Sequence, residues 1–186
     1  MIKDDRMIQR KVNLLVLLLL PIISFAQEIA KPRVSPVAIA TARYKDAYLK
    51  ITYSQPNKKG EEVFGSIVPF GEIWKTGDNE ATEMTITRDV LVNGAELKAG
   101  TYSLFTIPKK ENWTIIFNAD LGLWGSYNYN VKNDSLRFDV PVQTLTNAVY
   151  EPFTIAIDQK NEKAEISLLW DRTKVSFDVQ FQEPKP

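Results

Sequence analysis

The chain of 186 residues contains no histidine and no cysteine. Their absence excludes Ser-His-Asp and Cys-His catalysis, disulfide bonds and the usual His/Cys zinc sites, so any catalysis must use carboxylates, Lys, Tyr, Ser or Thr. Basic and acidic side chains are balanced at 23 each, with no basic stripe, which argues against nucleic acid and anionic membrane surfaces as partners. No motif indicates a cofactor or a metal, and any metal would be a hard cation held by oxygen ligands.

The N-terminus has the organisation of a signal peptide. Basic residues precede the apolar run VNLLVLLLLPIISFA, from Val12 to Ala26, which is shorter than the roughly 20 residues that a membrane-spanning helix needs. Pro21 interrupts this run, and small residues close it. We therefore expect cleavage after Ala26, a periplasmic or secreted protein, and no membrane span after cleavage. An uncleaved anchor is the alternative. Loss of residues 1–26 removes four basic and two acidic side chains, which changes the formal net charge from 0 to −2.

Most of the remaining chain alternates between apolar and polar residues with a period of two, the pattern of half-buried β-strands. Residues 27–37 are the exception and are expected to form an extended leader, because Pro32 and Pro36 oppose helix. In AYLKITY, for example, alternate residues from Leu49 onward are apolar. The segments with this pattern are 47–53, 81–87, 89–97, 98–108, 113–118, 135–142, 151–158, 164–170 and 174–181.

Local signals add turns and an edge to this pattern. Asn93-Gly94 between two short apolar runs is the strongest short signal for a hairpin, and the three residues from Asp171 to Thr173 are short enough for another. Pro141 indicates an edge strand or a bulge. No convincing helical period, repeat or linker is present. The sequence predicts a single all-β domain over residues 38–182, an antiparallel β-sandwich that is jelly-roll-like or a partly closed barrel, with little or no helix.

The stretch EIWKTGDNEAT, residues 72–82, carries the first candidate site. It lies in a run rich in glycine that predicts a long loop, and long loops in compact domains often bind ligands. The indole of Trp74 would be an apolar platform for a sugar or another polar ligand. The polar groups beside it come from Lys75, Thr76, Asn79 and Glu80. The alternative is that Trp74 closes the end of the core and the polar residues form a turn.

Residues 118–134, NADLGLWGSYNYNVKND, hold a second set of aromatic and amide side chains. Such a mixture is typical of carbohydrate-binding surfaces, because rings stack on sugar faces and amides bond to hydroxyls. We expect Trp124 and Tyr127 to flank the site at Trp74. Two alternatives remain open: a calcium loop that begins at Asn118, although the full EF-hand spacing is absent, and a turn whose aromatic rings fold inward.

Asp78 and Glu80 are the carboxylate pair best placed for acid/base hydrolysis. Two residues apart on an extended segment, they would share a face. Since most acidic residues of a protein are solvated, the sequence leaves open whether the protein is an enzyme.

Several blocks of the chain, in order, resemble the DUF2911 family. They are YSQPNKKG, VFGSIVPFGEIWKTGDNEAT, AGTYSLFTIP, WTIIFN and WGSYNYN, and the likeness runs from about Ser35 to Phe181. The resemblance implies an exported, β-rich single domain, as in proteins found largely in Bacteroidetes whose function is not established, and it implies no catalytic residue. After the tryptophan, the usual wording of the family is Arg-Thr-Gly-Ala-Asn-Glu-Ala-Thr. Here Lys75 and Asp78 replace the arginine and the first alanine, and lysine lacks the bidentate geometry of arginine.

Three functions are compatible with these features. The favoured one is a binding module for a polar small molecule, a glycan or an envelope component, because large aromatic residues stand in glycine-rich loops. The alternatives are a hydrolase that uses Asp78 and Glu80, and an accessory envelope protein without a pocket. The first requires the loops 72–82 and 122–130 to line one concavity. The sequence does not indicate the oligomeric state.

Overall fold

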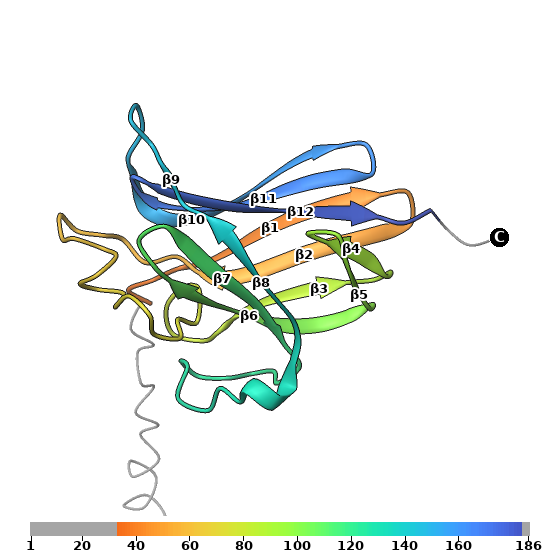
Figure 1. Ribbon diagram of the computed structural model, residues 1–186, viewed down its shortest axis with the longest axis horizontal. Helices are drawn as coiled ribbons and strands as arrows, with labels where there is room; N and C mark the ends of the chain where they lie inside the picture. Colours follow the sequence, from red (N-terminus) through yellow and green to blue (C-terminus); the bar gives the residue numbers. More distant parts are fainter. Residues whose placement is uncertain (1–32, 184–186) are drawn as a thin grey trace, which may run out of the picture. The chain divides into compact units, whose positions relative to one another are not determined.

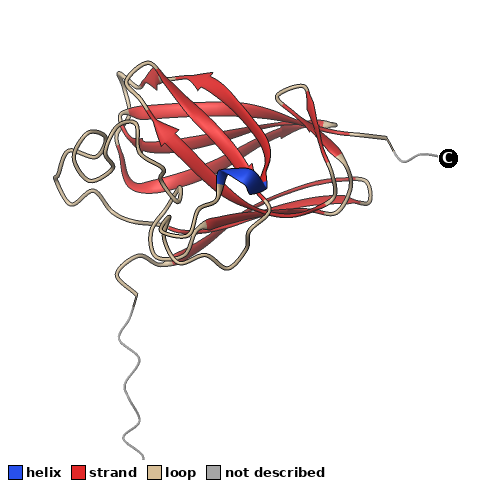
Figure 2. Ribbon diagram, turned by 60° about the horizontal axis from the view of Figure 1, so that its bottom comes forward, coloured by secondary structure: helices blue, strands red, loops and turns tan. Residues whose placement is uncertain are grey.

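The computed structural model describes residues 33–183, which form a two-layer β-sandwich (Figures 1 and 2). The predicted signal peptide and most of the predicted leader lie outside the described residues. Strand accounts for 58% of the structure and helix for 2%, so the predicted all-β class is confirmed. Within residues 33–183, no helix is long and apolar enough to cross a membrane.

The described part of the chain contains twelve strands and one short 3-10 helix, η2. Their bounds are β1 (Val37–Tyr44), β2 (Ala47–Ser54), β3 (Thr82–Ile86), β4 (Val90–Val92), β5 (Ala95–Leu97), β6 (Gly100–Pro108), β7 (Asn112–Asn118), η2 (Val131–Asn133), β8 (Asp134–Pro141), β9 (Gln143–Thr144), β10 (Tyr150–Lys160), β11 (Lys163–Asp171) and β12 (Thr173–Phe181).

The strands form two separate open sheets, in which all pairings between these strands are antiparallel. The first sheet has the order β1-β2-β3-β6-β7-β8, and the second has the order β10-β11-β12-β4-β5, with β9 paired to β12. The architecture is therefore a sandwich and not a closed barrel. Figure 1 shows the long loop between β2 and β3 at one end of the sheets, and the β1–β2 turn and the β4–β5 hairpin at the other.

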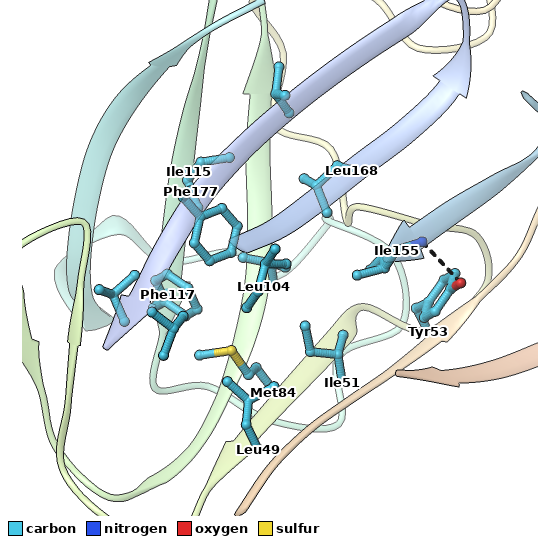
Figure 3. Packing of buried hydrophobic residues seen from close by; sticks show 14 of the residues in the cluster. Leu49, Ile51, Tyr53, Met84, Leu104, Ile115, Phe117, Ile155, Leu168 and Phe177 are labelled. Carbon is cyan, nitrogen blue, oxygen red and sulfur yellow. Dashed lines mark hydrogen bonds between the residues drawn. The ribbon is translucent and has the colours of Figure 1, made fainter. Parts of the chain in front are cut away.

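The core lies between the sheets and is built from the alternating residues that the sequence indicates. On β2, the buried side chains are Leu49, Ile51 and Tyr53, which face residues of the second sheet such as Ile155 (Figure 3). A buried hydroxyl needs a hydrogen-bond partner. The Ile155 amide donates to the Tyr53 hydroxyl over 3.0 Å, which ties the edge strand β10 to the first sheet. Burial raises the pKa of Tyr53, so the phenol remains protonated.

The predicted turns and edge are confirmed. Asn93 and Gly94 have φ values of 48° and 84°, the left-handed conformation that a tight two-residue hairpin requires, and they join β4 to β5. Trp170 pairs with Thr173 across the second tight turn, between β11 and β12. Pro141 ends β8, which is an edge strand of the first sheet.

Strand β1 was not predicted, because its alternation is inverted. Its larger apolar residues Val37 and Ile39 face solvent, and Ile39 is 62% exposed. Its inward positions hold three alanines and, at the end of the strand, Tyr44, and Ala42 is buried opposite Leu49. A strand with mostly small residues on its buried face and branched apolar residues on its exposed face does not show the expected contrast between an apolar and a polar face.

This inversion predicts opposite tolerances at neighbouring positions of β1. Ala42→Leu adds three carbons to a filled core and is expected to lower the free energy of unfolding by about 1–3 kcal/mol. Ile39→Thr, on the exposed face, is expected to change it by less than about 0.5 kcal/mol. Denaturant unfolding of both variants measures the difference. A larger loss for Ile39→Thr than for Ala42→Leu would contradict the assigned faces of β1.

Candidate functional site

The two loops singled out in the sequence are joined by backbone hydrogen bonds. The Ala81 amide donates to the Leu123 carbonyl over 2.9 Å, and the Gly125 amide donates to the Asn79 carbonyl over 3.0 Å. Between these bonds, Glu80 and Trp124 form an antiparallel bridge. The structure therefore brings the two loops together, as the binding hypothesis requires. In Figure 1 the second loop runs beneath β3 and β6.

A small second core holds both loops on the outer face of the first sheet. Phe105 of β6 and Ile116 of β7 point away from the main core and are fully buried with Ala81 beneath the loops. Leu123 and Tyr129 of the second loop pack on them, and the rings of Tyr129 and Phe105 are 5.1 Å apart. This explains the continuous apolar runs in β6 and β7, since strands buried on both faces do not alternate.

Trp74 is directed into the main core. Its amide donates to the Thr106 carbonyl over 2.8 Å, and the Thr106 amide donates back over 2.9 Å, so this residue continues the pairing of β6. The side chain is 8% exposed, and its indole Nε1 donates to the Gly77 carbonyl over 2.9 Å. Its ring centroid lies 5.1–5.9 Å from those of Phe64, Trp113, Phe153 and Trp170. The indole offers no open face to a ligand, so this position does not support the expected platform role of Trp74.

Thr76 is also structural in this position. It is fully buried and has a φ of 54°, a conformation that a β-branched residue seldom adopts. Three contacts hold it: its hydroxyl oxygen lies 3.2 Å from the Thr106 hydroxyl and 3.4 Å from the Trp74 carbonyl oxygen, and its carbonyl accepts from the Thr82 hydroxyl over 2.7 Å. The next residue must be glycine, because a Cβ on Gly77 would lie 2.9 Å from the Ser54 carbonyl oxygen.

Arg33 is the site residue that the sequence did not indicate. Its guanidinium donates two hydrogen bonds, of 2.8 and 2.6 Å, to the two carboxylate oxygens of Glu80. This bidentate pairing is the geometry that Lys75 cannot provide. The two residues are 47 positions apart and Arg33 lies in the predicted leader, so no local spacing pointed to it.

Beside this ion pair the outer face of the first sheet is hollowed. The hollow, which we call the outer-face hollow, has a volume of about 280 Å³. Its lining includes Arg33, Val37, Thr52, Glu80, Glu83 and Gly122. Glu83 stands on β3 and its Oε1 accepts a hydrogen bond of 2.9 Å from the Gly122 amide of the second loop.

Two of the predicted aromatic residues are exposed on the second loop. Trp124 is 61% exposed, and its bridge with Glu80 places the two side chains on the same side of the bridged pair. Tyr127 is 88% exposed, and its ring lies against Gly125, where a Cβ would be 2.9 Å from the ring. Tyr129, the third aromatic residue of this loop, folds inward onto Phe105 instead.

The predicted alternative of a calcium loop at Asn118 is not supported, because its side chain is used within the fold. It is buried, donates to the Asn130 carbonyl and to Asp134, and accepts from the Asp120 amide. Within residues 33–183, no group of three or more acidic residues is arranged to hold a metal ion.

The Tyr129 hydroxyl donates to the Asp134 carboxylate over 2.7 Å, and burial together with this carboxylate raises the pKa of Tyr129 to about 12.

The two carboxylates proposed for hydrolysis are both held in the charged form. Burial acts to raise the pKa of Asp78, but hydrogen bonds from Ser35 and the Asn79 amide and the charge of Lys75 outweigh it, and the pKa is below its ordinary value. The hydrogen bonds from Arg33 lower the pKa of Glu80. A general acid at neutral pH needs a raised pKa, which neither carboxyl has.

A larger hollow, of about 350 Å³, lies at the opposite end of the sandwich. Its charged residues pair with one another or with close neighbours: Arg88 with Asp46, Lys98 with Asp89 and Lys45 with Glu183. None of its lining residues is aromatic. We therefore place the candidate site at the outer-face hollow. Its lining includes residues of both loops, which are joined by backbone hydrogen bonds, and the second loop carries the exposed rings.

The model of DUF2911, a family described as a protein of unknown function, matches residues 35–179. The chain belongs to the DUF2911 family. No curated protein and no solved structure matches the DUF2911 chain. The matched range covers both loops and nearly all of the sandwich, and it includes the outer-face hollow except Arg33.

In this DUF2911 domain, the two departures from the usual wording of the family contact each other. The Lys75 ammonium lies 3.6 Å from the Asp78 carboxylate, whose other oxygen accepts a hydrogen bond of 2.7 Å from the Ser35 hydroxyl. Lys75 and Asp78 therefore fix the loop to the start of the described chain rather than face the outer-face hollow, whose lining includes neither.

The lowered pKa of Asp78 predicts a pH-dependent contribution to stability. A carboxyl whose pKa is lower in the folded state stabilises the fold above its ordinary pKa of 3.8 and loses this effect as the pH falls through the folded value. Asp78→Asn is therefore expected to be less stable than the wild type at pH 7, with a difference that shrinks below about pH 4. Urea unfolding from pH 7 to pH 2.5 measures this difference.

The matched control is Asp158→Asn, at an exposed position of β10. It removes a surface carboxylate without touching the loop, so its stability difference is expected to stay small throughout. A difference for Asp78→Asn that stays constant as the pH falls would contradict the assigned contacts of Asp78.

Proposed function

We propose that this DUF2911 protein is an exported binding module that takes a polar small molecule or a glycan at the outer-face hollow. One observation supports the proposal: Glu80, which pairs with Arg33 and lines the hollow, is bridged to Trp124, whose indole is exposed. Of the residues expected to bind, Glu80, Trp124 and Tyr127 remain in this proposal. Arg33 and Glu83 join them. Lys75, Thr76 and Asn79 support the loop.

The chemistry of these groups suits a polyhydroxylated ligand. An exposed indole gives a flat apolar face on which the carbon–hydrogen face of a sugar ring can stack. The carboxylates of Glu80 and Glu83 accept hydrogen bonds from hydroxyls, and the guanidinium of Arg33 donates them. Because Arg33 and Glu80 already fix each other, little side-chain freedom is lost on binding, which favours affinity.

The other two functions have weaker support. Neither carboxyl of the proposed hydrolase, Asp78 or Glu80, has a raised pKa. An accessory protein without a pocket does not account for an exposed indole on the residue bridged to Glu80, nor for the hollow of about 280 Å³. A binding role accounts for the exposed indole and for the hollow.

Trp124→Ala is expected to weaken glycan binding by about tenfold, because it removes the stacking face and its buried area. A thermal-shift screen of glycans and small polar metabolites identifies a ligand, and isothermal titration calorimetry of that ligand measures the loss. Tyr48→Ala is the control, since Tyr48 is an exposed ring on the first sheet near the β1–β2 turn, away from the hollow. Unchanged affinity in Trp124→Ala, or the absence of any ligand in the screen, would contradict the proposal.

We also propose that residues 1–26 are a signal peptide and that the mature protein begins at Gln27, in the periplasm or outside the cell. The basic start, the short apolar run and the small residues before Gln27 support this proposal. Mass spectrometry of the N-terminal peptide from envelope and culture fractions is expected to find Gln27 as the first residue. Recovery of the intact N-terminus from the cell interior would contradict export.

A further inference from the structure

We propose that the ligand of the outer-face hollow carries a protonated amine, as an amino sugar does, and that Glu83 is the residue that pairs with this amine. The inference rests on the proposed function and specifies its ligand class. It comes from the charges and hydrogen-bond capacities of the groups that line the hollow.

The lining of the hollow has an excess of negative charge. Two carboxylates, Glu80 and Glu83, face a single cation, Arg33. The Arg33 guanidinium donates one hydrogen bond to each carboxylate oxygen of Glu80. Arg33 therefore neutralises one carboxylate, and the lining of the hollow holds no second cation for the other.

The groups directly opposite Glu83 in the sheet, and the group that donates a hydrogen bond to it, are neutral. Its cross-strand neighbours in the sheet are Thr52 on β2 and Ser103 on β6, and its hydrogen-bond donor is the Gly122 amide. Lys50 stands one row further along, opposite Thr85. Among residues 33–183, the ion pairs closer than 4.0 Å do not involve Glu83.

Glu83 is also held in place. It stands near the start of β3, between two paired strands, and the Gly122 amide fixes one of its oxygens at 2.9 Å. A carboxylate can accept about four hydrogen bonds, so most of its capacity is available to a ligand. A fixed, charged acceptor that lacks a cation favours an ammonium group, which is compact and donates three hydrogen bonds.

The nearby indole favours the same ligand class. Trp124 is bridged to Glu80 at the edge of the hollow, and the face of an indole attracts cations through its quadrupole. An amino sugar presents a ring face for stacking and an ammonium for Glu83 in one molecule. An N-acetylated sugar keeps the ring face and loses the charge, which makes the two forms a matched pair of probes.

Calorimetric titration of the purified protein with the tetrasaccharides of glucosamine and of N-acetylglucosamine tests the inference. The wild type is expected to bind the amine form at least about fivefold more tightly, the range of a charge-assisted contact at a partly exposed site. Glu83→Gln keeps an acceptor for the Gly122 amide and is expected to remove this preference. The control is Glu96→Gln, because Glu96 is an exposed carboxylate on β5 that pairs with Lys98. This variant is expected to keep the preference for the amine form.

The outcomes separate this inference from the proposed function. Equal affinity for both tetrasaccharides, with a loss in Trp124→Ala, would overturn the amine and leave glycan binding in place. A preference for the amine form that persists in Glu83→Gln would overturn the role of Glu83. If neither tetrasaccharide binds, the amine inference fails, and the wider ligand screen decides the proposed function. Equal thermal unfolding of wild type and Glu83→Gln confirms that the variant is folded.

Discussion

The burial of the Trp74 indole is the interaction on which the arrangement of both loops depends. The ring packs among four other aromatic rings between the sheets, while its backbone pairs with Thr106 and its Nε1 bonds to Gly77. Removing a tryptophan from a core costs about 3–5 kcal/mol, a large part of the roughly 5–15 kcal/mol that holds a domain folded. The ring therefore stays in the core, and the loop from Lys75 to Ala81 is forced outward over the first sheet. There it meets the second loop through Ala81 and Asn79.

This constraint separates the tasks of the two loops. The first loop contributes rigidity through the buried Thr76 and the close approach of Gly77 to Ser54, and it presents Glu80 at its outer edge. The second loop contributes the exposed indole of Trp124. The start of the described chain completes the site, since Arg33 reaches across to fix Glu80. The groups of the proposed site thus come from three segments that are distant in sequence and rest on the first sheet.

Much of the fold could be predicted, because strands buried on one face, such as β2 and β12, alternate between apolar and polar residues with a period of two. It could not be predicted where burial departs from that pattern. In β1 the inward residues are alanines except Tyr44 at its end, and in β6 and β7 both faces are covered, so alternation was inverted or lost. At the proposed site, the sequence indicated both loops but placed Trp74 at the centre and Trp124 at the flank, because composition does not tell which indole the core encloses. Arg33 lay beyond any local signal, since its partner is distant along the chain.

The most direct test of this account is an NMR titration that follows the indole N–H signals of the four tryptophans. A bound glycan is expected to shift the signal of Trp124 alone, while the signals of Trp74, Trp113 and Trp170 stay in place and exchange slowly with deuterated solvent. A shift confined to Trp74, or rapid exchange of its indole proton, would show that the ring is open to ligands and would contradict the account.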